Sequence, residues 1–249
     1  MHSSLTIENV SHLQGLTHIS QQVSPLLIPL SEGVNAIRPD SESSTEILTL
    51  YSYWQQAHPE AGAIYWQTRT WAMLTWQPVT IALIATYYSD VVPKLSSMKQ
   101  GLNTESGVVG TFDFVEDEWT AGDQHQRQQL AAQELTKLLS NLADQLGEVC
   151  RMSPATREKL LADTVMEMLL RGLKHRVGSN RLASNKLHAT FAHELAHWQQ
   201  LLALPLSRFG RLDVSHDGEL FIQRRSCCMH YRRRDGSYCQ GCPQNKSRT

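Results

Sequence analysis

Apolar residues recur at helical spacing through most of the middle of the chain. From Thr45 to Tyr88 this pattern favours helix and is rich in tryptophan, and we expect those rings to lie in the core. Three more helices are expected: one capped by Asp123, one that begins at Ser153-Pro154, and one over about 184–203. Each carries large apolar residues every three to four positions, which predicts one face buried in a shared core.

Two segments depart from the helical pattern and favour strands. Residues 107–119 contain β-forming residues in partial alternation, and the sequence after Pro205 predicts a hairpin that turns at Asp217-Gly218. Residues 1–45 are polar and weakly patterned. We therefore predict an α+β protein, predominantly helical, with a mainly helical domain over 1–205. A β-hairpin and a small C-terminal subdomain are expected over 206–249.

One uncharged stretch raises the question of a membrane. It runs from Trp71 to Ser89, WAMLTWQPVTIALIATYYS, and is close to the roughly 20 apolar residues that a spanning helix needs. It also contains Gln77-Pro78 and three threonines. We predict a buried core helix broken near Pro78, since proline removes a helical hydrogen bond. Peripheral attachment to a membrane stays open as an alternative.

Composition and charge narrow the class of protein. The chain has 249 residues, of which 41% are hydrophobic and 19% charged, as in ordinary globular proteins. Its N-terminus lacks the pattern of a secretory signal, which favours a cytoplasmic protein in a reducing compartment. The net charge of -1 conceals an uneven distribution, because Arg224 to Thr249 contains seven Lys and Arg residues and one Asp. A basic segment therefore ends an otherwise acidic chain.

Four of the five cysteines lie in this basic segment, within RRSCCMHYRRRDGSYCQGCPQ. They are Cys227, Cys228, Cys239 and Cys242. Gly241 and Pro243 suit a tight turn that directs the last two sulfurs to one metal site. Adjacent cysteines suit a single zinc ion poorly, since zinc sites usually separate paired ligands by two to four residues. We predict that these four cysteines bind a [2Fe–2S] cluster, with zinc as the alternative, and that Cys150 is a packed thiol.

The segment resembles the C-terminal signature of the FhuF-type ferric-siderophore reductases, C-C-x10-C-x2-C, which in that family ligates a [2Fe–2S] cluster. Arg224-Arg225 before the cysteine pair and Tyr231-Arg232 after it also resemble the family. The resemblance is specific over about 218–243 and looser upstream. It implies a siderophore-iron reductase that reduces Fe³⁺ in a hydroxamate-type siderophore to Fe²⁺. It implies no catalytic residues beyond the cluster ligands.

The electron donor and the arginines complete this hypothesis. No G-x-G-x-x-G motif supports a dinucleotide site, so we expect an external donor such as a ferredoxin or flavin reductase. A four-thiolate [2Fe–2S] cluster carries a charge of about -2 when oxidised and about -3 when reduced. Nearby cations would favour the reduced form and attract an acidic donor or an anionic ferric chelate. The alternative is that the arginines form only a solvated tail.

Two other function classes compete with this hypothesis. A zinc-stabilised basic module could bind nucleic acid, but the basic segment is short and lacks interleaved aromatics, so no nucleic-acid partner is expected. His193, Glu194 and His197 spell H-E-x-x-H, the zinc protease motif. Gln200 replaces the glycine of the extended motif, and helical phase places both histidines toward solvent, so the protease is less favoured. A further alternative is that this face, with His188, borders the substrate pocket.

Overall fold

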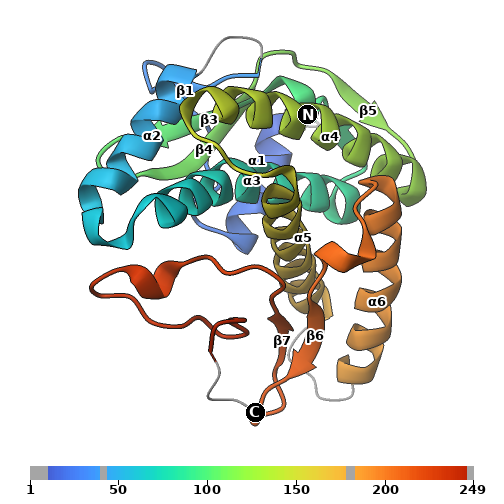
Figure 1. Ribbon diagram of the computed structural model, residues 1–249. Helices are drawn as coiled ribbons and strands as arrows, with labels where there is room; N and C mark the ends of the chain where they lie inside the picture. The colour runs from blue at the N-terminus through green and yellow to red at the C-terminus, as the bar shows by residue number, and fades with distance from the viewer. Residues whose placement is uncertain (1–10, 40–43, 178–182, 246–249) are drawn as a thin grey trace, which may run out of the picture.

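The computed structural model describes residues 11–39, 44–177 and 183–245 and confirms a predominantly helical α+β fold (Figure 1). Its α-helices are α1 (His12–Val23), α2 (Ser44–Ala57), α3 (Ala63–Tyr88), α4 (Gln124–Val149), α5 (Pro154–Val177) and α6 (Ala183–Leu201). Its strands are β1 (Ala36–Ile37), β2 (Val91–Pro93), β3 (Met98–Asn103), β4 (Val108–Phe114), β5 (Trp119–Ala121), β6 (Arg211–Val214) and β7 (Leu220–Gln223). Short 3-10 turns are η1 (Pro59–Ala61), η2 (Leu95–Ser97), η3 (Leu206–Arg208) and η4 (His230–Arg232).

Helix α3 is the centre of the core and packs against α2, α4 and α5. The predicted break near Pro78 is wrong, because α3 continues through this residue. Pro78 has no N–H to donate to the carbonyl of Leu74. The Gln100 side chain from β3 donates to that carbonyl at 3.0 Å instead, so the buried acceptor is satisfied and the helix is preserved. None of the helices in the described part of the chain combines the length and apolar character that a bilayer crossing needs.

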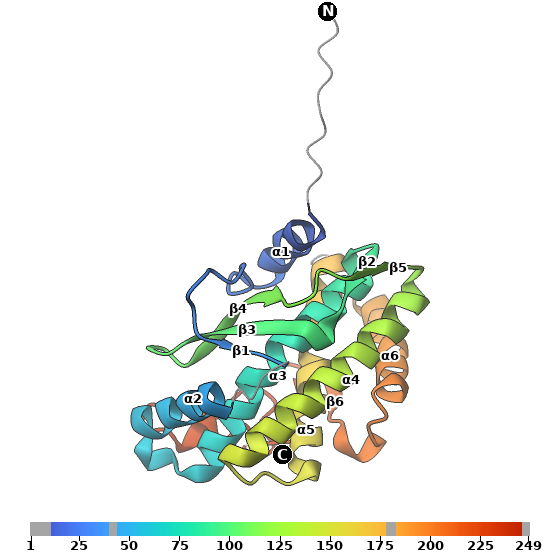
Figure 2. The same cartoon turned by 90° about the horizontal axis from the view of Figure 1, so that it is seen from above.

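An antiparallel sheet in the order β1-β3-β4 lies between α1 and α3 (Figure 2). Strand β4 confirms most of the strand predicted over 107–119. Helix α1 and strand β3 were not predicted. Helix α1 begins with a capping box, in which Ser11 and Gln14 satisfy each other's backbone N–H groups. The indole nitrogen of Trp76 donates to Val109 at 2.9 Å and thereby joins α3 to β4.

Helices α4, α5 and α6 follow the predicted apolar pattern. Asp123 caps α4 and forms a capping box with Gln126. Ser153 accepts a hydrogen bond from the N–H of Thr156 at the start of α5, with Pro154 as its first residue. Phe191 and Trp198 of α6 are almost fully buried, as their stripe predicted. The three helices thus form one wall of the core.

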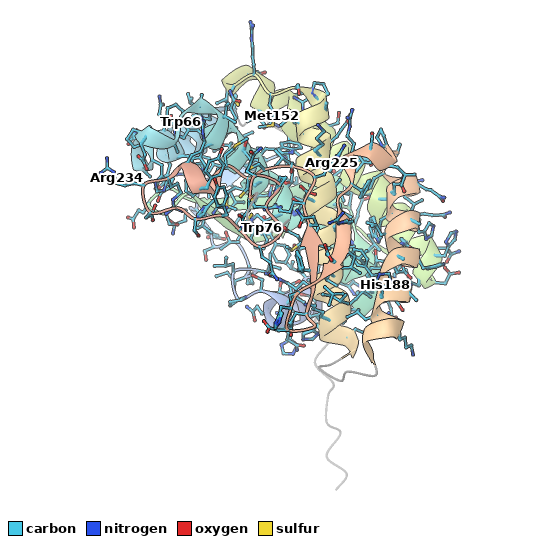
Figure 3. The ribbon with its side chains drawn as sticks, turned by 60° about the horizontal axis from the view of Figure 1, so that its bottom comes forward. Trp66, Trp76, Met152, His188, Arg225 and Arg234 are labelled. Carbon is cyan, nitrogen blue, oxygen red and sulfur yellow. The ribbon has the colours of Figure 1, made fainter. Side chains whose placement is uncertain are left out.

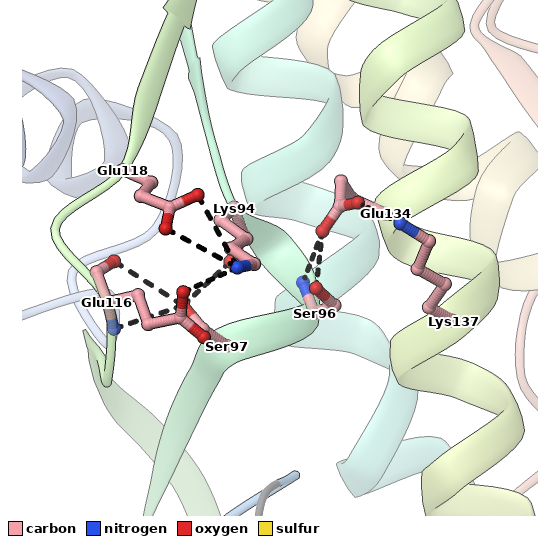
Figure 4. A network of polar contacts seen from close by, with 7 residues as sticks. All are labelled: Lys94, Ser96, Ser97, Glu116, Glu118, Glu134 and Lys137. Atoms are coloured by element: carbon pink, nitrogen blue, oxygen red, sulfur yellow. Dashed lines mark hydrogen bonds and ion pairs between the residues drawn. The ribbon is translucent and has the colours of Figure 1, made fainter.

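A polar network connects η2 with α4 and with the loop between β4 and β5 (Figure 4). Glu134 of α4 accepts hydrogen bonds from Ser96 and pairs with Lys137 at 2.6 Å. Lys94 forms ion pairs with Glu116 and Glu118 on the far side of η2. These contacts fix the edge of the small sheet β2-β5 against α4, remote from the cysteines.

Candidate metal centre

The C-terminal segment forms a loop that leaves β7 and returns to it. Strands β6 and β7 form the predicted hairpin, with Gly218 in the left-handed region at φ 78°. The N–H of Arg224 donates to the carbonyl of Gly241 at 3.0 Å, which brings the C-x-x-C turn beside the adjacent cysteines. The loop lies on one side of α5 and α6 lies on the other (Figure 1). Residues that are eleven or more positions apart therefore meet at the end of the hairpin.

Gly241 is needed where the two stretches touch. Its φ is 71°, and a Cβ atom there would lie 2.0 Å from the carbonyl oxygen of Ile222 in β7. We expect Gly241→Ala to destabilise the segment by roughly 1–3 kcal/mol, the usual range for such strain, and to lower the iron bound per chain. Gly147→Ala is the matched control, because a Cβ on this exposed position of α4 meets nothing within 4 Å. Equal iron content in both variants would contradict this role of Gly241.

The four cysteines form two pairs, each of which joins the two stretches. The sulfurs of Cys228 and Cys239 are 3.8 Å apart, and Cys227 lies near enough to Cys242 for Cys242 to help raise the pKa of Cys227. None of the four forms a disulfide. In the described ranges no three His, Cys, Asp or Glu side chains converge as a single metal ion requires. A [2Fe–2S] cluster takes four cysteines, two on each iron, and this site brings four cysteines from the two stretches together.

The surroundings of the sulfurs also fit an iron–sulfur cluster. The N–H of Met229 points to the sulfur of Cys227 at 3.4 Å, because Met229 adopts a left-handed conformation with φ 58°. Hydrogen bonds of this kind tune clusters. A hydrogen bond from Cys228 and the positive charge of Arg224 hold the pKa of Cys239 at about 7, whereas burial raises that of Cys227 to about 11. The same hydrogen bond raises the pKa of Cys228, so Cys239 is the member of this pair that gives up its proton first; metal binding requires the thiolate form.

Asp163 of α5 anchors the chain just before the cysteine pair. Its carboxylate is fully buried and accepts hydrogen bonds from the N–H of Arg225 at 2.9 Å and the N–H of Ser226 at 2.8 Å. The hydroxyl of Ser226 donates to it at 2.5 Å. Burial raises the pKa of Asp163, and these hydrogen bonds oppose that rise. Helix α5 therefore determines where the cysteine loop begins.

Arg224 lies between this anchor and the cysteines. Its Nε is 3.1 Å from Glu167 and 3.9 Å from Asp163. Burial by itself would lower the pKa of Arg224, but Glu167 and the cysteines raise it. Arg224 therefore stays charged beside the sulfurs, with two carboxylates as partners.

The arginines farther along the loop attach it to the turn between α2 and α3. Arg232 donates to the carbonyl of Ala61 at 3.2 Å, and the N–H of Arg234 donates to Glu60 at 2.9 Å. Figure 3 shows Arg234 at the outer end of the loop. The solvated-tail interpretation is thus wrong for Arg224, whose side chain is largely buried, whereas Arg232 is exposed but held by its hydrogen bond to Ala61. Lys246 and Arg248 lie outside the described residues.

A cavity of about 230 Å³ opens beside the Cys228–Cys239 pair, between α3, α5 and the loop. Apolar and aromatic side chains line much of it, including Tyr65, Met73, Trp76 and Met168. Arg69 and Arg224 add positive charge to the lining. Sequence patterns did not identify Arg69 or Asp163 as parts of this site. The available signal for Arg69 was that it is the single charged residue within α3.

The H-E-x-x-H motif lies in a different place and has a structural partner. Tyr87 of α3 donates to the carboxylate of Glu194 at 2.6 Å, and Gln128 of α4 donates at 3.3 Å. Glu194 therefore connects three helices and is not free to act as a general base. His193 and His197 line a separate groove with His125.

This groove and the cysteine cavity have no lining residue in common, so the histidine face does not border that cavity. Figure 3 shows His188 on α6, across α5 from the cysteine loop. Cys150, at the end of α4, packs against the core as expected, and burial raises its pKa to about 11.

Comparison with known proteins identifies the C-terminal segment. Residues 224–244 match the family model described as FhuF 2Fe-2S C-terminal domain. No solved structure matches the chain. The matched residues include all four paired cysteines and Arg224. The chain therefore carries a FhuF-type 2Fe–2S C-terminal domain, whose cofactor is a [2Fe–2S] cluster.

Proposed function

We propose that this protein is a siderophore-iron reductase in which Cys227, Cys228, Cys239 and Cys242 ligate the cluster. The observation that carries the proposal is the coincidence of the FhuF-type 2Fe–2S match with two cysteine pairs at an accessible cavity. The proposed substrate is Fe³⁺ in a hydroxamate-type siderophore.

The reaction needs one electron and breaks no covalent bond of the siderophore. A bound [2Fe–2S] cluster supplies a one-electron store. The electron passes to Fe³⁺, which the hard hydroxamate oxygens bind tightly, and the resulting Fe²⁺ is held more weakly and can be released. An external redox protein, such as a ferredoxin or flavin reductase, provides the electron and is itself oxidised by one electron.

The residues around the cysteines support this role in three ways. Cys242 is 5% exposed and packs under the hairpin, while Cys228 and Cys239 are partly exposed and face the cavity. The apolar part of the cavity wall, which includes Met73 and Met168, lowers the polarity near this pair and so strengthens electrostatic interactions there. Outside the cavity, Arg225 and Arg234 are exposed at the two ends of the cysteine loop, where their positive charges would attract an acidic donor or an anionic chelate.

The proposal is tested by iron release under anaerobic conditions. Protein reduced by one electron is mixed with a ferric hydroxamate chelate, and Fe²⁺ is followed with a colour-forming Fe²⁺ chelator. We expect Fe²⁺ to form with wild-type protein and with His193→Ala, whose side chain is 79% exposed and distant from the cysteine cavity. We expect no Fe²⁺ above background with Cys239→Ser. Reduced wild-type protein that releases no Fe²⁺ from any hydroxamate chelate would contradict the siderophore role.

A further inference from the structure

Helix α3 carries one charged residue in 26, and this residue lies at the cysteine site. Arg69 projects into the cavity that Cys228 and Cys239 line. Its guanidinium carbon is 4.8 Å from the ring centroid of Trp54, which supports it from α2 through a cation–π contact. The helical core thus holds a positive charge at a defined position beside the cysteine loop.

Arg69 has no carboxylate partner within ion-pair distance among the residues that the structure describes. Burial lowers its pKa, which shows that its charge is costly where it lies. Tyr65 and, to a smaller extent, Cys228 oppose this lowering of the Arg69 pKa, whereas the neighbouring Arg233 adds to it. Buried charges in proteins are normally paired. Glu167 also lines the cavity but is paired with Arg224 at 3.1 Å, so the counter-charge left for Arg69 is that of the cysteine thiolates and of the group that they bind.

We propose that Arg69 is the uncompensated cation through which the helical core stabilises the reduced form of the cluster. This inference rests on the proposed ligation by the four cysteines. Uptake of one electron adds one negative charge to the site, and a fixed positive charge in a partly buried cavity favours that state. No proton or further reactant is required for this effect.

The position of Arg69 distinguishes it from the other cations of the site. Arg224 is close to the same cysteines, but Glu167 and Asp163 offset its charge. Arg225 is close in sequence to the cysteine pair, but its side chain is exposed, so the solvent screens its charge. Arg69 combines partial burial with the lack of a described acidic partner, and we therefore expect its charge to have the larger influence.

The test is the midpoint potential of the cluster, measured by redox titration followed by EPR. For Arg69→Gln we expect the ratio of reduced to oxidised cluster at a fixed potential to fall about tenfold, which for one electron is a midpoint lower by about 59 mV. Arg69→Lys, which keeps the charge, is expected to remain close to wild type. Arg225→Gln is the control with an exposed arginine and is expected to change the ratio much less.

Two results would overturn the inference. One is an unchanged midpoint in Arg69→Gln, and the other is an equal decrease in Arg225→Gln, which would show an effect of net charge alone. If Arg69→Gln cannot hold the cluster, the result depends on Arg69→Lys. A cluster that binds to Arg69→Lys with the wild-type midpoint potential supports the inference. Loss of the cluster from both variants overturns it. Iron content and absorption are recorded first, so failure of cysteine ligation appears as iron-free wild-type protein and is distinguished from failure of this inference.

Discussion

Replacement of Asp163 by alanine is expected to release the cluster and to destabilise the protein by about 3–5 kcal/mol, the usual cost of breaking a buried charged network. The carboxylate accepts three hydrogen bonds from Arg225 and Ser226, and its loss leaves one buried and one partly buried N–H group without an acceptor. The chain before Cys227 then loses its attachment to α5. Iron bound per chain and urea unfolding followed by circular dichroism measure the two effects.

Asp144→Ala is the matched control for this variant, because Asp144 is exposed on α4. We expect its unfolding free energy to stay within about 0.5 kcal/mol of wild type. Asp163→Asn keeps one acceptor oxygen but removes the charge, so an intermediate loss of stability is expected. Wild-type iron content and stability in Asp163→Ala would show that α5 does not anchor the cysteine loop.

Replacement of Cys228 by serine is expected to abolish the bound [2Fe–2S] cluster. Cys228 and Cys239 form one of the two sulfur pairs, and a serine hydroxyl gives up its proton far less readily than a thiol and does not provide the soft ligand that iron–sulfur sites use. Iron and acid-labile sulfide per chain, together with visible absorption, measure this loss.

Cys150→Ser is the control, since Cys150 lies at the end of α4 and packs against the core. It is expected to retain full iron and sulfide. An equal loss from both variants would indicate a general effect on folding, and retention of the cluster by Cys228→Ser would remove Cys228 from the proposed ligands.

Local sequence signals were sufficient to predict the features that depend on residues close together in the chain. The caps at Asp123 and Ser153, the turn at Gly218 and the α6 stripe each follow from short patterns, and the structure confirms them. The cysteine cluster was also predictable, because its spacing is specific and the hairpin leads directly into it. Helical phase likewise placed His193 toward solvent.

The missed features depend on contacts between distant parts of the chain. Strand β3 has the polar sequence MKQGLN, which lacks β-forming periodicity and becomes a strand because it pairs with β4. The break expected at Pro78 is prevented by Gln100, 22 positions later in the chain. Asp163 and Arg69 sit on ordinary helical segments, and their roles emerge only when the cysteine loop packs beside α5 and α3.

The most direct test of the central claim is the metal content and EPR spectrum of anaerobically purified full-length protein. The account predicts a red-brown protein with about two irons and two acid-labile sulfides per chain, and an EPR signal that appears on one-electron reduction. A colourless protein that contains zinc, or one that holds no iron after reconstitution with iron and sulfide, would contradict it.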